Sequence, residues 1–180
     1  QAARVGGADV IVELGGDAPL VDPLLIDEML AYYLDGGFDY VANTAMRHSA
    51  AWKEESTFPV GTSVEIFSTE LLGKVAEWTR DPIDREHVSS YIFERPGRFR
   101  LGAFEAAGTW ASCRRPDIRL TVDTPQDLAL MDATRAISLL AMVFVMRSTV
   151  SFEFNRRSGL GGSDSMQNGV VALFSMENDA

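Results

Sequence analysis

The sequence predicts an α/β fold in which helices cover both faces of a sheet. Short β-rich apolar runs alternate along the chain with segments whose apolar residues recur every three or four positions. The first run, Ala8–Leu14, is short, β-branched and bounded by glycines, as expected of a strand buried on both faces. Strand and helix then follow one another through most of the chain, which favours a sheet with helical crossovers.

Length and composition fit one folded unit. The chain has 180 residues, of which 46% are hydrophobic and 23% charged, so it can bury a core and is not disordered as a whole. Its 16 basic and 26 acidic residues give a net charge of -10, which argues against nucleic acid as the main partner. Cys113 is the single cysteine, so an internal disulfide is excluded and a cytoplasmic protein is expected. The longest apolar run, Ala136–Met146, falls short of the roughly 20 residues of a membrane span.

The first elements are well marked. Residues 1–5 resemble the last turn of a helix that ends at Gly6-Gly7, and we therefore expect further residues before Gln1. Asp22 and Pro23 then suit the N-cap and first position of an amphipathic helix ending at Gly36-Gly37.

The remaining elements follow in order. An irregular connection is expected over Thr44–Thr62. Strands are expected at Phe38–Asn43, Ser63–Phe67, Phe99–Phe104 and Arg119–Val122, and helices begin at Ser68 or Thr69, at Asp81-Pro82 and at Thr124-Pro125.

The character of the chain changes near residue 137. We predict one unit over residues 1–136 and an atypical extension over residues 137–180, which lacks helix caps and a clear period. That extension is expected to be an extra hairpin, a swapped arm or a poorly ordered tail, and not to carry chemistry.

Two carboxylates stand out by position. Asp17 follows the first strand almost at once, and Asp123 directly follows the expected strand Arg119–Val122. Ligands of open α/β sheets bind beyond the carboxyl ends of strands, so both side chains could face one crevice. Two like charges placed together favour a cation, and Mg²⁺ prefers such oxygen ligands. The alternative is that Asp17 only shapes a turn and Asp123 only supports a helix cap.

Six segments in sequence order resemble one known family. They are Ala8–Val12, Gly16–Pro23, Asp39–Asn43, Phe58–Phe67, Arg85–Val88 and Leu120–Leu128. Together they resemble the cytidylyltransferases of spore coat polysaccharide biosynthesis protein F type, relatives of the enzymes that make CMP-linked sugar acids. The resemblance covers about residues 2–133, and the order of the segments makes it specific where each alone is weak.

The resemblance implies a Rossmann-like nucleotide-diphospho-sugar transferase sheet with helices on both faces. A sugar hydroxyl would attack the α-phosphorus of CTP and release pyrophosphate, with Mg²⁺ neutralising the charge that develops. Asp17 and Asp123 would be the catalytic metal ligands. The substrate-binding residues it implies on the sugar side are Gly61, Glu65, Arg85, Glu86 and His87.

The resemblance also implies what else the enzyme would need. The family's first strand and glycine-rich triphosphate loop would precede Gln1, so this chain alone is expected to be inactive. CTP and a sugar are the expected partners, with no membrane, and homodimers are frequent among the relatives.

Two other functions stay open. A glycosyltransferase using a nucleotide sugar would share this architecture, but such enzymes usually carry Asp-x-Asp, which is absent from the 180 residues. A non-catalytic sugar-binding module is the other alternative, and residues 85–87 could then be merely a solvated helix face.

Overall fold

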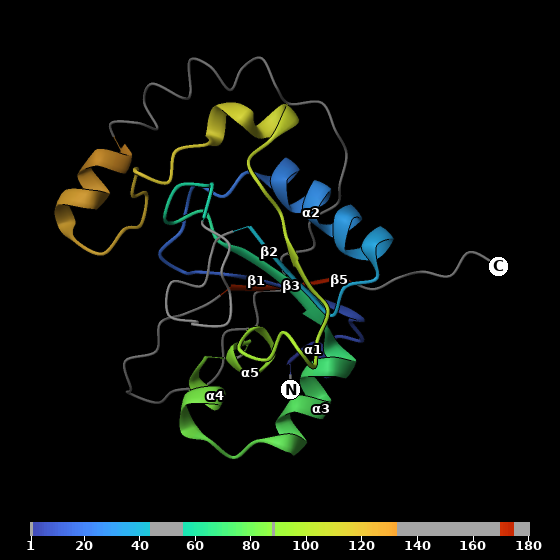
Figure 1. Ribbon diagram of the computed structural model, residues 1–180. Helices are drawn as coiled ribbons and strands as arrows, with labels where there is room; N and C mark the ends of the chain where they lie inside the picture. The colour runs from blue at the N-terminus through green and yellow to red at the C-terminus, as the bar shows by residue number, and fades with distance from the viewer. Residues whose placement is uncertain (1, 44–55, 88, 133–169, 175–180) are drawn as a thin grey trace.

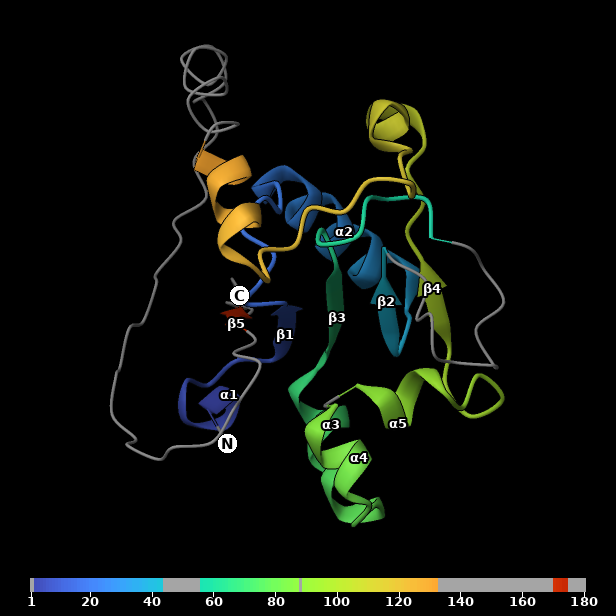
Figure 2. The ribbon, with the colours of Figure 1, turned by 90° about the vertical axis from the view of Figure 1, so that its left-hand side faces the viewer.

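A five-stranded mixed sheet with helices on both faces forms the body of the protein. The computed structural model describes residues 2–43, 56–87, 89–132 and the backbone of 170–174. The strand order is β4-β2-β3-β1-β5, which Figure 2 shows from one edge of the sheet to the other. Strand β3 runs antiparallel to both of its neighbours, whereas β2 and β4 are parallel.

The elements alternate as the sequence predicts. The strands are β1 (Val10–Leu14), β2 (Tyr40–Ala42), β3 (Val64–Ser68), β4 (Leu101–Ala103) and β5 (Val170–Phe174). The helices are α1 (Ala2–Val5), α2 (Pro23–Gly36), α3 (Thr69–Trp78), α4 (Pro82–Glu86), α5 (Ser90–Phe93), the 3₁₀ helix η1 (Gly108–Cys113) and a helix that starts at residue 125 and is described to residue 132.

Helix α2 lies on one side of the sheet and α3, α4 and α5 on the other (Figure 1). The alternation of side chains along β1 explains this arrangement, because successive residues of a strand face opposite sides. Val10 and Val12 join the core under α2, while Ile11 joins the core under the other helices. Both faces of β1 are therefore buried, as its apolar sequence predicts.

The predicted caps are present. Asp22 accepts a hydrogen bond from the Leu24 N–H at the start of α2, and Ser68 does the same for Leu71 at the start of α3. Gly37 ends α2 with a φ of 60°, a conformation that glycine adopts without strain.

The helical stretch predicted from Asp81 to Pro96 is wrong as one unit. In the structure α4 ends at Glu86 and α5 begins at Ser90. The Ser90 hydroxyl donates to the His87 carbonyl at 2.8 Å, and a side chain that bonds to nearby backbone in this way competes with helix continuation.

The predicted strand Arg119–Val122 is also wrong. Only an isolated parallel bridge joins Val60 to Arg119, because the segment divides its backbone bonds between two partners. Val60 donates to the Ile118 carbonyl at 2.9 Å and accepts from Leu120 at 2.7 Å, whereas Val122 donates to the Asp17 carbonyl at 2.9 Å.

The C-terminal region supplies one strand to the sheet. Backbone bonding pairs β5 antiparallel with β1 over five residues. The rest of the extension and most of the irregular connection, residues 44–55, lie outside the described residues, and the boundary at residue 137 stays a prediction. Within the described part, no helix is both long and apolar enough to span a bilayer.

Asn43 fixes the loop before β3. Its side chain is 3% exposed, donates to the Thr62 carbonyl at 2.8 Å and accepts from the Val64 N–H at 2.8 Å. We expect Asn43→Ala to lower the free energy of unfolding by about 3 kcal/mol, since it leaves two buried backbone groups without partners. Urea denaturation followed by circular dichroism measures this. Ser56→Ala, which removes a partly buried hydroxyl bonded to Phe58 only two residues away, is the control and should cost less than about 1 kcal/mol. Equal losses in the two variants would contradict this role of Asn43.

Candidate active site

The turn after β1 places Asp17 at the carboxyl edge of the sheet. Because β3 runs opposite to β1, the loop that precedes β3 comes to the same edge. Asp17 is exposed, and its carboxylate lies over Gly15: a Cβ at Gly15 would come within 2.5 Å of Asp17 Oδ1. Because Gly15 has no side chain, the turn leaves room for this carboxylate.

Residues 118–122 are held at this edge by the backbone. Val60 binds the segment through both its N–H and its carbonyl, and Asp17 binds it through its carbonyl. Gly61 reinforces the contact, since its φ is +91° and a Cβ there would lie 2.6 Å from the Thr121 nitrogen. The bond from Val122 to Asp17 brings Asp123 beside the turn that carries Asp17.

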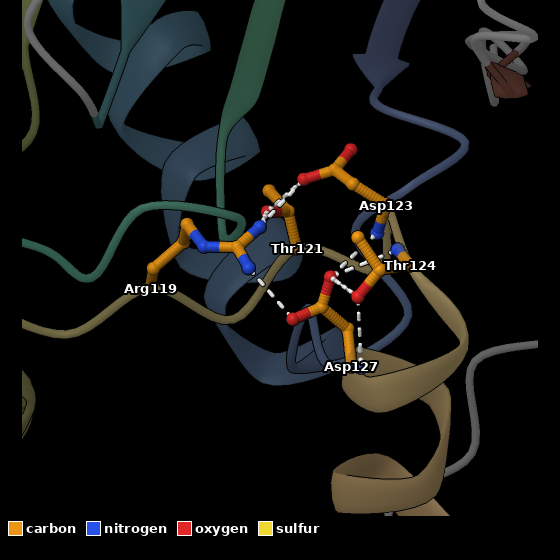
Figure 3. Close-up of polar contacts among 5 residues, drawn as sticks. All are labelled: Arg119, Thr121, Asp123, Thr124 and Asp127. Carbon is orange, nitrogen blue, oxygen red and sulfur yellow. Dashed lines mark hydrogen bonds and ion pairs between the residues drawn. The ribbon is translucent and has the colours of Figure 1, made fainter.

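Arg119 bridges two carboxylates at this edge (Figure 3). Its Nη1 lies 2.6 Å from Asp123 Oδ2 and its Nη2 lies 2.6 Å from Asp127 Oδ1. The Thr121 hydroxyl donates to the same Asp123 oxygen at 2.8 Å. The Asp123 carboxylate is thus oriented by two donors, and its side chain is still 55% exposed.

Asp127 belongs to a capping box. Its Oδ2 accepts from the Thr124 N–H at 2.9 Å, and the Thr124 hydroxyl accepts from the Asp127 N–H at 3.2 Å. The hydrogen bond from the Thr124 hydroxyl is the largest cause of the lowered pKa of Asp127. Both oxygens of Asp127 are therefore engaged, one by the start of the helix and the other by Arg119.

The chemistry of Asp17 and Asp123 fits a divalent cation of the Mg²⁺ type. Both offer exposed carboxylate oxygens from segments that are bonded to each other, and Mg²⁺ is usually held by one or two carboxylates together with substrate phosphates. Over the described ranges no three His, Cys, Asp or Glu side chains gather into a site that could hold a metal without substrate. Asp17 and Asp123 therefore fit a cation site in which substrate oxygens supply the remaining ligands.

A second acidic pair lies on the α3–α5 side of the sheet. Glu13 of β1 and Glu65 of β3 stand directly opposite each other in the antiparallel register. Glu65 accepts a short hydrogen bond from the Ser89 hydroxyl, and Glu13 Oε2 is a buried atom without a hydrogen-bond partner among the described residues. Burial, and then the Glu65 charge, raise the pKa of Glu13 to about 7.

Burial also raises the pKa of Glu65, but other interactions oppose this shift. Hydrogen bonds from the Ser89 and Tyr40 hydroxyls, and the charge of His87, favour its ionised form and oppose the effect of burial. Burial therefore favours the neutral form of both carboxyls, and Glu65 has hydrogen-bond donors that oppose this effect whereas Glu13 does not.

The structure places the sugar-side residues unequally. Glu65 and His87 are close enough to interact electrostatically. Arg85 instead donates to the Ala76 carbonyl at 2.9 Å and covers the C-terminal end of α3, while Glu86 is exposed. Gly61 packs on Thr121 and not in an open loop. The substrate roles of all five residues stay predictions.

Sequence reasoning missed several partners in both clusters. Asp127 could have been found, because Thr124 followed by an acid three positions later is a capping signal. Glu13 also has a signal, since an acid inside a buried apolar strand is unusual. Arg119 lies only four and eight residues before its two acids, whereas Ser89 has no local signal, because it is 24 residues from Glu65.

Three known proteins resemble the chain. An uncharacterised protein of Methanocaldococcus jannaschii is 33% identical over 130 residues, which make up 72% of this chain and 47% of that protein. The spore coat polysaccharide biosynthesis protein SpsF of Bacillus subtilis is 33% identical over 119 residues, 66% of this chain and 43% of the relative. The chain thus spans just under half the length of these curated relatives. No family model matches it.

The structural comparison agrees with these. A cytidylyltransferase structure from Leptospira borgpetersenii serovar Hardjo-bovis aligns with a TM-score of 0.60 at 25% identity, over 83% of this chain and 64% of that one. The mixed sheet, with helices on both faces, is therefore the Rossmann-like architecture of nucleotidyltransferases. The SpsF relative and the cytidylyltransferase structure support the assignment that the six motifs predict, to the cytidylyltransferase family of spore coat polysaccharide biosynthesis protein F type.

The pair of Glu13 and Glu65 makes the free energy of unfolding depend on pH. The pKa of Glu13 is about 7 in the folded protein, whereas its ordinary value, expected for the unfolded chain, is 4.5. The folded state therefore binds more protons between these values, and the free energy of unfolding should fall as pH rises, by up to about 3 kcal/mol. Urea denaturation at pH 5, 6, 7 and 8 measures the slope. Glu13→Gln should flatten it, and an unchanged slope in this variant would refute the assignment.

Gly61 should be intolerant of a side chain. We expect Gly61→Ala to lower the free energy of unfolding by about 2 to 4 kcal/mol, because it combines an unfavourable φ with a clash against Thr121. Gly108→Ala is the matched control: Gly108 has a φ of +54° and open space around its Cβ position, so only the conformational cost of about 1 kcal/mol applies. Urea denaturation compares the two. Equal losses would mean that the contact between Gly61 and residues 120–121 contributes nothing.

Proposed function

We propose that this chain forms the part of a cytidylyltransferase that binds the cation. The complete protein would transfer CMP from CTP to a sugar or sugar acid in surface polysaccharide biosynthesis and release pyrophosphate. The supporting observation is the 2.9 Å bond from the Val122 N–H to the Asp17 carbonyl. It joins the two acidic motifs that the family uses, although 105 residues separate Asp17 from Val122 in the sequence.

Asp17 and Asp123 would hold Mg²⁺, which when bound would neutralise the charge of the triphosphate. The residues around them would keep this arrangement ready before substrate arrives. Thr121 orients the Asp123 carboxylate by its hydroxyl, and Val60 fixes the main chain on either side of residue 119. A preorganised carboxylate loses little freedom on binding, so it contributes more to catalysis than a mobile one.

Glu65 and His87 would serve the sugar. Glu65 is a hydrogen-bond acceptor on the α4–α5 side of the sheet, with Ser89 supporting its ionised form. His87 is exposed beside it. A carboxyl group next to an exposed imidazole suits sugar hydroxyls, which can donate to the first and accept from the second.

Replacement of Asp123 tests the proposal. In the complete gene product, Asp123→Asn should lower turnover by about 100-fold or more, since the neutral amide is a poor ligand for a hard cation. The assay is Mg²⁺-dependent release of pyrophosphate from CTP in the presence of candidate sugars.

Asp117→Asn is the control, because Asp117 is an exposed carboxylate on the same segment that is paired with Arg115 and has no role in the proposed chemistry. It should leave turnover within about twofold of the parent. Near-parental turnover of Asp123→Asn would remove the cation assignment. Calorimetry that detects sugar binding but no Mg²⁺-dependent CTP binding would favour a sugar-binding module instead.

A further inference from the structure

Arg119 makes two ion pairs that differ in kind. Its Nη2 meets Asp127, whose side chain is only 15% exposed and whose other oxygen caps the helix at residue 125. Its Nη1 meets Asp123, whose side chain is 55% exposed. The first contact is anchored by the fold, whereas the second faces solvent and can be exchanged.

The Asp123 contact engages the same carboxylate that the proposed function gives to a cation. The guanidinium and the Thr121 hydroxyl both bind Asp123 Oδ2, at 2.6 and 2.8 Å. A divalent cation at that oxygen would lie within a few ångströms of the guanidinium, and the two positive charges would repel. The arginine and the cation therefore compete for one carboxylate.

We propose that Arg119 is a positioning residue that serves as the resident counter-ion of Asp123. Its Nη1 holds the carboxylate while no cation is bound, and a bound cation displaces that contact. The Nη2 contact with Asp127 keeps the displaced arginine at the rim, where its freed donors suit an incoming phosphate oxygen. This inference rests on the proposed function of Asp123. It adds that the site binds a bare cation weakly.

Two features support exchange over a permanent ion pair. Arg119 is half exposed, so water and ions reach the Asp123 contact, and ion pairs of this kind contribute little to stability. The planar fork of arginine carries several donors, so it can keep one carboxylate while releasing the other. The capping box holds Asp127 in place throughout, because its Oδ2 bonds do not depend on Arg119.

Binding of Mn²⁺ alone tests the inference without any measurement of turnover. The free ion is followed by electron paramagnetic resonance at fixed ionic strength, with circular dichroism to verify folding. Arg119→Gln should bind Mn²⁺ roughly tenfold more tightly than the parent chain, the order expected when one positive charge beside a divalent cation is removed. Arg115→Gln is the matched control, since Arg115 is similarly exposed and paired with Asp117. It should stay within about twofold, as expected for a charge screened by salt.

A second measurement uses the unaltered protein. Addition of Mg²⁺ should shift the Nε–H resonance of Arg119, assigned with Arg119→Lys, and should not shift it in Asp123→Asn. These results together with the tighter binding would support the inference. Parental Mn²⁺ affinity in Arg119→Gln would overturn the inference, and so would an Arg119 resonance that Mg²⁺ does not shift. In either case, loss of cation binding in Asp123→Asn would still support the cation assignment. Undiminished binding in Asp123→Asn would overturn both the inference and the cation site on which it rests.

Discussion

The carboxyl edge of the sheet, where Asp17 and Asp123 lie, is called the rim. Its arrangement depends on three backbone hydrogen bonds to residues 118–122. Val60 supplies two of them and Asp17 the third, and together they hold an irregular segment against the carboxyl edge of the sheet. Backbone bonds suit this task because they do not depend on side-chain charge or pH. Once residues 118–122 are fixed, the place of Asp123 follows. The loop before β3 and residues 118–122 are thus held together, with Gly61 allowing their close approach.

Repulsion between neighbouring carboxylates is reduced differently in the Asp123–Asp127 cluster and in the Glu13–Glu65 pair. At the exposed rim, Arg119 lies between Asp123 and Asp127 and provides a positive charge. On the α3–α5 side, burial and the Glu65 charge raise the pKa of Glu13 to about 7. The difference follows from solvation, because a carboxylate in water keeps its charge cheaply whereas a buried one is favoured in its neutral form.

Much of the fold could be predicted from local patterns, and the errors have a common cause. The caps at Asp22 and Ser68 are decided by residues a few positions apart and were predicted correctly. Residues 119–122 have the composition of a strand, yet a strand needs a neighbour with matching register, and among the described residues their strand pairing is limited to the bridge between Arg119 and Val60. The division between α4 and α5 depends on a serine hydroxyl that bonds backward to His87, a choice that apolar periodicity does not reveal.

The sequence by itself determined the class of fold, the family and the two acidic motifs, because periodicity, caps and motif order are properties of nearby residues. The tertiary structure alone decided which distant side chains meet: Glu13 with Glu65, and Ser89 with Glu65. Such pairings depend on strand order and on the direction of β3, which result from packing both faces of the sheet at once. Local sequence carries no record of that choice, since the same side chains in another strand order would meet other partners.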